Sequence, residues 1–264
     1  MNNSILAIKD YWDSRALKHS KDTQGTTNDI YLRALEIKTV KTQIKNANLL
    51  AGAVIIDIGC GDGFSTLELA KEFPDYQFIG VDYSQNMITN AKSNKSDQYK
   101  NVEFKAVDIF KLNEVFCLAS FDIAITMRVL INLPDFQLQS KALEIISKLL
   151  KSNGRYIAIE NFEDGQENMN KMRTSLGLPQ IPIRWHNLFF DATPFKLVAQ
   201  QYYRNVEIID FASTYYYITR IVYSQMCLLQ GVEPDYEHPI HRVAVELPAN
   251  GEYSPVKLVI LTKD

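Results

Sequence analysis

Cysteine is scarce in this sequence, and its placement excludes the structural roles that cysteine most often has. The three cysteines in 264 residues do not follow the spacing of a zinc site, and an odd number does not suggest a disulfide framework. We therefore expect a reducing, cytoplasmic setting. Metal-type spacing is also lacking among His19, His238 and His241, so no metal ion is expected.

Long apolar runs and blocks of basic residues are missing as well. No stretch approaches the roughly 20 apolar residues that cross a membrane, and the first residues do not resemble a secretory signal. The net charge is −3, and no dense Lys/Arg block gives the basic footprint of a protein that grips duplex nucleic acid. The sequence therefore predicts a protein that binds neither membranes nor DNA.

What the sequence does contain is an alternation of strand-like and helix-like segments from about residue 53. Several expected strands are nearly continuous apolar runs, which is typical of strands buried on both faces of a parallel sheet. Repeated strand–helix units predict an α/β fold with right-handed crossovers. The expected strands are 53–58, 77–82, 102–107, 121–126, 155–160, 206–211 and a last one near the C-terminus.

The segment VIIDIGCGDGFST has glycines at every second position, Gly59, Gly61 and Gly63, directly after the first strand. Ligands of open α/β sheets bind beyond the carboxyl ends of the strands. Glycine allows positive φ and lets a ligand approach the backbone closely. Asp82 follows at the end of the second strand, where an acid commonly binds ribose hydroxyls. These features predict a binding loop for a nucleoside-containing cofactor.

The spacing alone leaves more than one interpretation open. The dinucleotide fingerprint requires a glycine where Phe64 stands, which argues against a nicotinamide-dependent oxidoreductase, although Asp82 suits both kinds of cofactor. The acids also have purely structural interpretations. Asp57 would cap the turn, and Asp82 would be the N-cap of the next helix.

Five motifs in series, over about residues 50–160, resemble those of class I S-adenosylmethionine-dependent methyltransferases. The glycine segment resembles their first motif and FIGVDYSQNMI the second, while VEFKAVDIF, FDIAITMRVLINLPD and LLKSNGRYIAIE resemble the third to the fifth. The resemblance implies a Rossmann-like α/β fold whose seven-stranded sheet is mostly parallel, with an antiparallel last strand and helices on both faces. It also implies an enzyme that uses S-adenosyl-L-methionine and releases S-adenosyl-L-homocysteine.

We expect one methyltransferase domain over residues 1–264, because no linker or repeat divides the chain. Residues 1–50 are expected to form an N-terminal helical cap, and residues 51–160 the cofactor-binding core. The insertions 161–205 and 212–252 are expected to cover the substrate.

The resemblance also implies roles for particular residues. Asp82 would bind both ribose hydroxyls and Asp108 the adenine amino group, while Asp57 belongs to an acidic site that favours the cationic groups of the cofactor. Arg15, or alternatively Arg33, is a candidate for the cofactor carboxylate, unless these residues only form a solvated helix face. The other residues expected at the cofactor are Gly59, Cys60, Gly61, Tyr83, Met87, Ile109 and Met127.

The segment RWHNLFF is the best candidate for the methyl-acceptor site. His186 is the expected catalytic base, because the unperturbed pKa of histidine lies near neutrality. Arg184, Trp185 and Asn187 would contact the acceptor, although a purely structural cluster is the alternative. Arg128, after the fourth strand, would hold an anionic acceptor.

Two more residues complete the expected acceptor site. Glu160 ends the fifth strand and would either contact the acceptor or neutralise Arg128 or Arg184. Since consecutive residues on a helix do not share a face, only one or two tyrosines of the run STYYYITR can line a pocket, and Tyr216 is our candidate. The same tyrosine-rich segment would equally serve as a homodimer surface.

The leading functional hypothesis is methyl transfer to a hydroxyl, with an amine as second choice, of a small, polar, anionic metabolite. A fainter resemblance of the region after the core to a bacterial subgroup points to a sugar or activated glycan precursor. Alternatives are a methyltransferase that acts on a protein or RNA, an NAD(P)-dependent oxidoreductase, and a catalytically silent partner. The segment MRVLINLPD lacks the signature of amino-group methylation on nucleic-acid bases.

Overall fold

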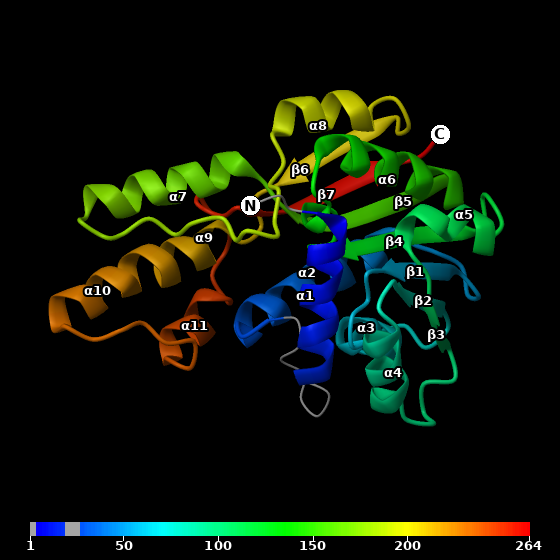
Figure 1. Cartoon of the computed structure of the whole chain (residues 1–264), viewed down its shortest axis with the longest axis horizontal. Helices are drawn as coiled ribbons and strands as arrows, with labels where there is room; N and C mark the ends of the chain where they lie inside the picture. Colours follow the sequence, from blue (N-terminus) through cyan, green and yellow to red (C-terminus); the bar gives the residue numbers. More distant parts are fainter. Residues whose placement is uncertain (1–3, 19–26) are drawn as a thin grey trace.

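A seven-stranded β-sheet forms the centre of the computed structural model, which describes residues 4–18 and 27–264 (Figure 1). The strands are β1 (Val54–Ile58), β2 (Gln77–Asp82), β3 (Val102–Ala106), β4 (Phe121–Met127), β5 (Leu150–Asn161), β6 (Asn205–Ile209) and β7 (Val256–Thr262). Their order in the sheet is β3-β2-β1-β4-β5-β7-β6.

The sheet has the topology that the sequence predicts. Strands β1 to β5 pair in parallel, whereas β7 runs antiparallel to β5 and to β6. The strand order reverses at β1, which pairs with β2 on one side and with β4 on the other. Open α/β sheets bind ligands at such a switch point, beyond the carboxyl ends of the strands. The expected Rossmann-like fold is therefore confirmed.

Helices flank the sheet on both faces. The α-helices are α1 (Ile5–Lys18), α2 (Ile30–Asn46), α3 (Phe64–Glu72), α4 (Gln85–Asn94), α5 (Leu112–Val115), α6 (Phe136–Leu149), α7 (Glu163–Ser175), α8 (Ala192–Ala199), α9 (Ser213–Tyr216), α10 (Tyr223–Gln230) and α11 (Pro239–Ala244). Two short 3-10 turns, η1 (Ile109–Lys111) and η2 (Leu130–Asn132), and a π-helical segment, η3 (Tyr217–Val222), complete the described elements.

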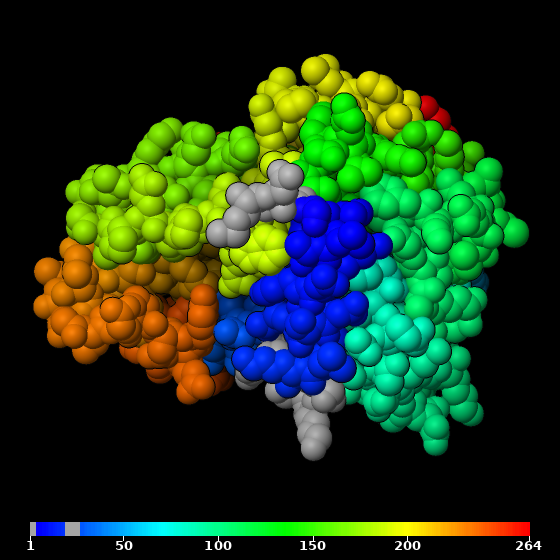
Figure 2. All heavy atoms as spheres, viewed as in Figure 1, coloured from blue at the N-terminus to red at the C-terminus, as the bar shows by residue number. Residues whose placement is uncertain are grey.

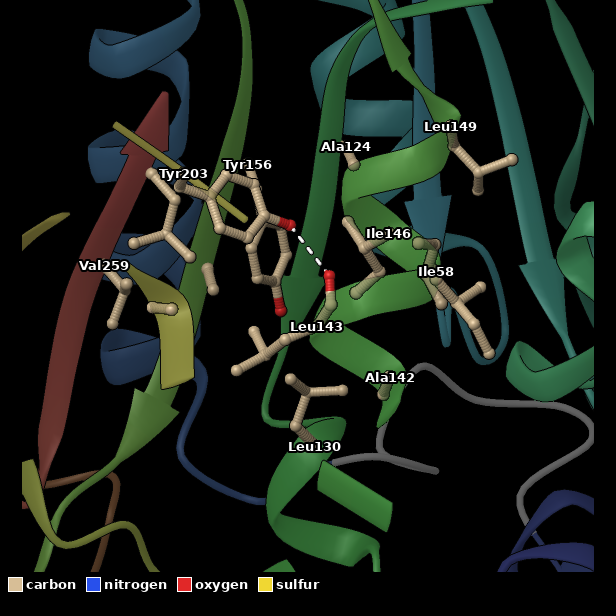
Figure 3. Packing of buried hydrophobic residues seen from close by; sticks show 14 of the residues in the cluster. Ile58, Ala124, Leu130, Ala142, Leu143, Ile146, Leu149, Tyr156, Tyr203 and Val259 are labelled. Carbon is tan, nitrogen blue, oxygen red and sulfur yellow. Dashed lines mark hydrogen bonds between the residues drawn. The ribbon is translucent and has the colours of Figure 1, made fainter. Parts of the chain in front are cut away.

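Two apolar clusters hold these layers together, because the strand side chains alternate between the two faces. On one face, α6 and α8 pack on β1, β4, β5 and β7, and Figure 3 shows Leu143 and Ile146 of α6 beside Ala124 and Tyr156 of the sheet. On the other face, α2, α3 and α4 cover the sheet. The buried strands on both faces explain the nearly continuous apolar runs in the sequence.

The elements outside this core lie around one end of the sheet. Figure 1 shows α7, α10 and α11 extending to one side of the molecule. In Figure 2, α1 (blue) lies on the surface between the segment that follows α7 (yellow-green) and the part of the core around α4 (cyan to green). No helix in the described ranges combines the length and the apolar character that crossing a bilayer requires.

Candidate functional site

The glycine loop after β1 requires glycine for conformation and for space. Gly59, Gly61 and Gly63 have φ values of +72°, +55° and +78°, a region that other residues rarely adopt. A Cβ on Gly59 would lie 2.5 Å from Val129 Cγ2, and one on Gly63 would lie 2.7 Å from Phe104 Cζ. Val129 and Phe104 therefore pack closely against the loop at these two glycines.

Asp82, at the end of β2, holds the glycine loop and faces a pocket. Its Oδ2 accepts a hydrogen bond from the Gly61 N–H at 3.0 Å, and its Oδ1 accepts one from the Ser84 N–H at 2.9 Å. Burial raises the pKa of Asp82 to about 6, against the effect of these two N–H donors. Its position fits both the ribose role and a structural role in fixing the turn.

The pocket lies at the carboxyl ends of β1, β2, β3 and β4 and is partly open to solvent. Most of the residues expected at the cofactor line it, namely Gly59, Gly61, Asp82, Tyr83, Met87, Asp108, Ile109 and Met127. The structure thus brings together residues from four strand ends that lie far apart in the sequence.

Three other residues expected at the cofactor do not line this pocket in the described part of the chain. Asp57 is buried behind the glycine loop, where its Oδ2 accepts a 2.6 Å hydrogen bond from Thr66 Oγ1 of α3. Cys60 is buried beside Gly80, and burial raises the pKa of its thiol. Arg15 is half-buried on α1, and Arg33 on α2 lies over the Phe64 ring at 4.1 Å, beside the loop.

Asp108 connects the pocket to α1. Its Oδ1 accepts a hydrogen bond from the Phe110 N–H at 3.0 Å, and its Oδ2 lies 2.5 Å from Lys9 Nζ. Sequence reasoning did not identify Lys9. The signal was present, because the pocket-lining residues of α1 follow the helical spacing i, i+3, i+4, i+7, as Ile5, Ile8, Lys9 and Trp12.

Helix α1 is attached to the pocket rim by side-chain hydrogen bonds. The Ser84 hydroxyl donates to the Asp13 carboxylate, so that α1 contacts the N-terminus of α4. Trp12 Nε1 donates to Asn132 Oδ1 at 3.1 Å, and Asn132 itself lines the pocket. These bonds hold α1 at the pocket, which Trp12 lines.

His186 lies at the junction of α1 and the loop before α8. Its ring stacks on Tyr11 at a centroid distance of 4.5 Å, and it is only 4% exposed. Its Nδ1 has no hydrogen-bond partner among the described residues. Burial, followed by the charges of Arg184 and Arg15, lowers the pKa of His186 to about 4. This value lies below the unperturbed pKa of histidine, so the imidazole is neutral at pH 7.

The neighbours of His186 divide into pocket residues and outside residues. Arg184 and Asn187 line the pocket, and the Arg184 guanidinium has no ion pair among the described residues. Trp185 is 45% exposed and packs edge-on against His186 at 5.3 Å, outside the lining. The Leu188 N–H donates to the Ile131 carbonyl at 2.7 Å, which ties this loop to η2.

Arg128 lines the pocket but already has a carboxylate partner. Its guanidinium lies 3.3 Å from Glu36 Oε2, and Glu36 Oε1 has no hydrogen-bond partner within the described ranges. Burial raises the pKa of Glu36, while the charge of Arg128 opposes that shift. Sequence reasoning missed Glu36, although an acid on the buried side of α2, next to Ile37, was a usable signal.

The tyrosine-rich segment is fixed by its own contacts and does not line the pocket in the described chain. Tyr216 is half-buried and lies near Arg220, at 5.5 Å from ring centroid to guanidinium. The Tyr215 hydroxyl is 2.7 Å from Asp29 Oδ1 and 2.7 Å from His241 Nδ1, so the segment is joined to α2 and α11. A homodimer surface on this segment stays a prediction.

Glu160 is not at the acceptor side of the pocket. Its buried carboxylate accepts hydrogen bonds from the Thr126 hydroxyl and from backbone N–H groups after β4. Neither Arg128 nor Arg184 pairs with it in the described chain. The interpretations of Glu160 as an acceptor contact or as an arginine partner are therefore corrected, because its side chain turns towards the backbone of η2.

The pocket suits a sulfonium nucleoside better than a dinucleotide. Asp82 and Asp108 both line it and are acids that can accept hydrogen bonds, and the glycine loop leaves no space for side chains. The cationic residues of the described lining are Lys9, Arg128 and Arg184, of which the first two have carboxylate partners. Within the described lining, Arg184 is thus the cation without a carboxylate partner that a pyrophosphate would meet.

Comparison with known proteins agrees with this geometry. A family model described as a methyltransferase domain matches residues 49–204, more than half of the chain. The demethylmenaquinone methyltransferase of Lactococcus lactis is 34% identical over 119 residues, which are 44% of this chain and 45% of that protein. The malonyl-[acyl-carrier protein] O-methyltransferase of Halalkalibacterium halodurans is 36% identical over 104 residues, 38% of this chain and 36% of that protein.

The match to these curated relatives spans less than half of their length. Among solved structures, magnesium protoporphyrin IX methyltransferase from Synechocystis, with bound S-adenosylhomocysteine, has a TM-score of 0.63 at 13% identity. That likeness covers 99% of this chain and 100% of the other, and it shows a shared fold. The chain belongs to the class I methyltransferases, which use S-adenosyl-L-methionine as the methyl donor.

Proposed function

We propose that this protein methylates a hydroxyl group of a small, polar, anionic metabolite, such as a sugar or an activated glycan precursor. The observation that carries this proposal is Arg184, which lines the pocket without an ion pair in the described chain, two residues before His186. An unpaired guanidinium favours a carboxylate or phosphate, which it can bind in bidentate geometry. The unpartnered Nδ1 of His186 offers an acceptor for a hydroxyl hydrogen.

The cofactor, when bound, supplies an electrophilic methyl group on a positively charged sulfur. The chain's own residues then have to hold the nucleoside and align the acceptor. In this proposal Asp82 accepts hydrogen bonds from the ribose hydroxyls and Asp108 accepts one from the adenine amino group, which their positions in the pocket lining support. Arg15 and Arg33, on the two N-terminal helices, are the candidates for the carboxylate of the methionine part.

His186 has a hydrogen-bonding role at the reacting hydroxyl in this proposal. A neutral imidazole accepts the hydroxyl proton, but a pKa of about 4 makes it a weak base. The proton therefore leaves the oxygen late, when methyl transfer has made that oxygen strongly acidic. The rings of Tyr11 and Trp12 exclude water from this position, which protects the donor from hydrolysis.

We infer the acceptor class from Arg184 and His186 in this pocket and not from the relatives. The named relatives include a demethylmenaquinone methyltransferase and a malonyl-[acyl-carrier protein] O-methyltransferase, so their acceptors differ widely. A protein or RNA acceptor remains the alternative, and the solved structures include a methyltransferase in complex with an activator protein, Trm112.

A substrate panel tests the proposal. Purified protein with S-adenosyl-L-methionine is offered sugar phosphates, nucleotide sugars and hydroxy acids, each matched with a neutral analogue of the same size, and the release of S-adenosylhomocysteine is measured. Turnover confined to anionic compounds supports the proposal. Equal turnover of the neutral analogues, or methyl transfer only to protein or RNA fractions, contradicts it.

A further inference from the structure

The segment between β4 and α6 forms part of the pocket lining and packs beside the glycine loop. Its first residue, Arg128, has a φ of +58°, which places the chain in a conformation that arginine rarely adopts. Val129 fills the space beside Gly59, and Asn132 accepts the hydrogen bond of Trp12 from α1. A shift of this segment would therefore change both the space beside Gly59 and the hydrogen bond between Asn132 and Trp12 that attaches α1.

One buried carboxylate fixes this segment. Glu160 Oε1 accepts hydrogen bonds from the N–H groups of Val129 at 3.1 Å and Leu130 at 3.0 Å. Glu160 Oε2 accepts one from the Ile131 N–H at 3.3 Å, and Thr126 Oγ1 donates to Oε1 at 2.9 Å. The residue is 1% exposed. Three successive backbone donors thus converge on a side chain from the neighbouring strand.

We propose that Glu160 is a positioning residue for methyl transfer, which holds residues 128–132 against the glycine loop in the geometry that cofactor binding requires. The inference goes beyond the proposed function, because it concerns the wall of the cofactor pocket and does not depend on the acceptor. It also gives a role to a strand-end acid that touches neither the pocket nor an arginine in the described chain.

Stability alone does not account for a carboxylate at this position. Burial raises the pKa of Glu160 to about 7, although its backbone and hydroxyl donors oppose the shift, so the ionised form is held at a cost in folding free energy. An ionised carboxylate only accepts hydrogen bonds, whereas an amide of the same shape has one acceptor oxygen and an NH₂ group. In Glu160→Gln, that NH₂ group would face the Ile131 N–H, donor against donor.

The isosteric variant therefore separates a positioning role from a structural one. At pH 8, we expect Glu160→Gln to keep or raise the midpoint of urea unfolding, because it removes a buried charge. We expect at least tenfold faster amide hydrogen exchange at residues 129–131, and at least tenfold weaker binding of S-adenosylhomocysteine by calorimetry. Glu144→Gln, on the partly exposed side of α6, is the matched control and should change none of these three quantities.

Two outcomes would overturn the proposal. The first is exchange at residues 129–131 and S-adenosylhomocysteine affinity that stay within twofold of the unaltered protein. The second is a lowered unfolding midpoint with faster exchange throughout the chain, which indicates a structural role only. If Glu160→Gln does not fold, Glu160→Asp decides in the same assays, since it keeps the charge and withdraws it from the three N–H donors. A failure of the acceptor proposal leaves all of these measurements unchanged.

Discussion

Tyr11 of α1 stacks on His186, with the two rings inclined by 25° and their centroids 4.5 Å apart. This contact joins the N-terminal helix to the expected acceptor site and helps to bury the imidazole. Burial is the largest cause that lowers the pKa of His186 to about 4. We therefore expect the stack to contribute to the neutral state of His186, the best candidate for an acceptor-binding group.

Tyr11→Ala should admit water to His186 and raise its pKa by about one unit or more towards 6.5. An NMR titration of the imidazole measures the value, and Tyr11→Phe is the control because it keeps the stacked ring. A histidine whose pKa is lowered in the fold loses stability as pH falls from about 6.5 to 4, so Tyr11→Ala should also weaken this acid dependence. An unchanged pKa would show that other groups bury the imidazole.

Asp82→Ala should abolish the binding of S-adenosylhomocysteine. The change removes the acceptors that face the pocket and the bond to the Gly61 N–H, and losing two charge-assisted hydrogen bonds lowers affinity by roughly 100-fold or more. Calorimetry measures the dissociation constant, with Asp97→Ala at an exposed position as the control. Unchanged affinity in Asp82→Ala would contradict the cofactor role.

His186→Ala should lower kcat by about 100-fold or more, the usual contribution of a positioned proton acceptor. Binding of S-adenosylhomocysteine should change by less than about threefold, because the cofactor contacts come mainly from the strand ends. His186→Asn is the informative control, since its amide oxygen can replace Nδ1 as a hydrogen-bond acceptor and should restore part of kcat. Equal kcat in all three proteins would leave His186 with a packing role.

Arg184→Ala should raise KM for an anionic acceptor by about tenfold or more, the loss expected for one charge-assisted pair. KM for a neutral analogue and the affinity for S-adenosylhomocysteine should stay unchanged. Arg184→Lys should recover part of the loss, and the exposed Arg204→Ala should have no effect. If KM rises equally for neutral and anionic compounds, Arg184 shapes the loop and does not bind the anion.

The sequence was sufficient to predict the fold and the position of two acids, Asp82 and Asp108, at the ends of strands. Apolar runs located β1, β4 and β5, the strand–helix alternation located β2 with Asp82 at its end, and the family resemblance singled out Asp108 after β3; both acids line the pocket. Such positions depend on local pattern and on the general topology of α/β sheets. The antiparallel last strand came with the family resemblance.

The residues that sequence reasoning missed or misplaced depend on how helices and loops pack. Lys9 reaches Asp108 through the packing of α1 against α4, and Glu36 meets Arg128 through the packing of α2 against β5. Glu160 was expected at the pocket, but its side chain turns to the N–H groups after β4. Neither periodicity nor motif spacing specifies such side-chain directions.

Asp57 offers a test in which stability and binding should change in opposite directions. Burial raises its pKa to about 7, although the hydroxyl of Thr66 opposes the shift. The folded protein thus holds a proton that the unfolded chain loses near pH 4, so stability falls as pH rises between about 4 and 7. In Asp57→Asn this loss is absent. The free energy of unfolding should therefore exceed that of the unaltered protein by up to roughly 4 kcal/mol at pH 8, with little difference at pH 4.

Urea unfolding at pH 4, 6 and 8 measures the gain, and Asp97→Asn should show no comparable pH-dependent change. Binding of S-adenosylhomocysteine should weaken in Asp57→Asn, because the residue belongs to the acidic surroundings of the glycine loop and is bonded to α3. Stability that rises while affinity falls would mean that the buried acid is retained for ligand binding at the expense of folding free energy. A gain that is independent of pH would instead show that Asp57 is ionised in the folded protein throughout this range.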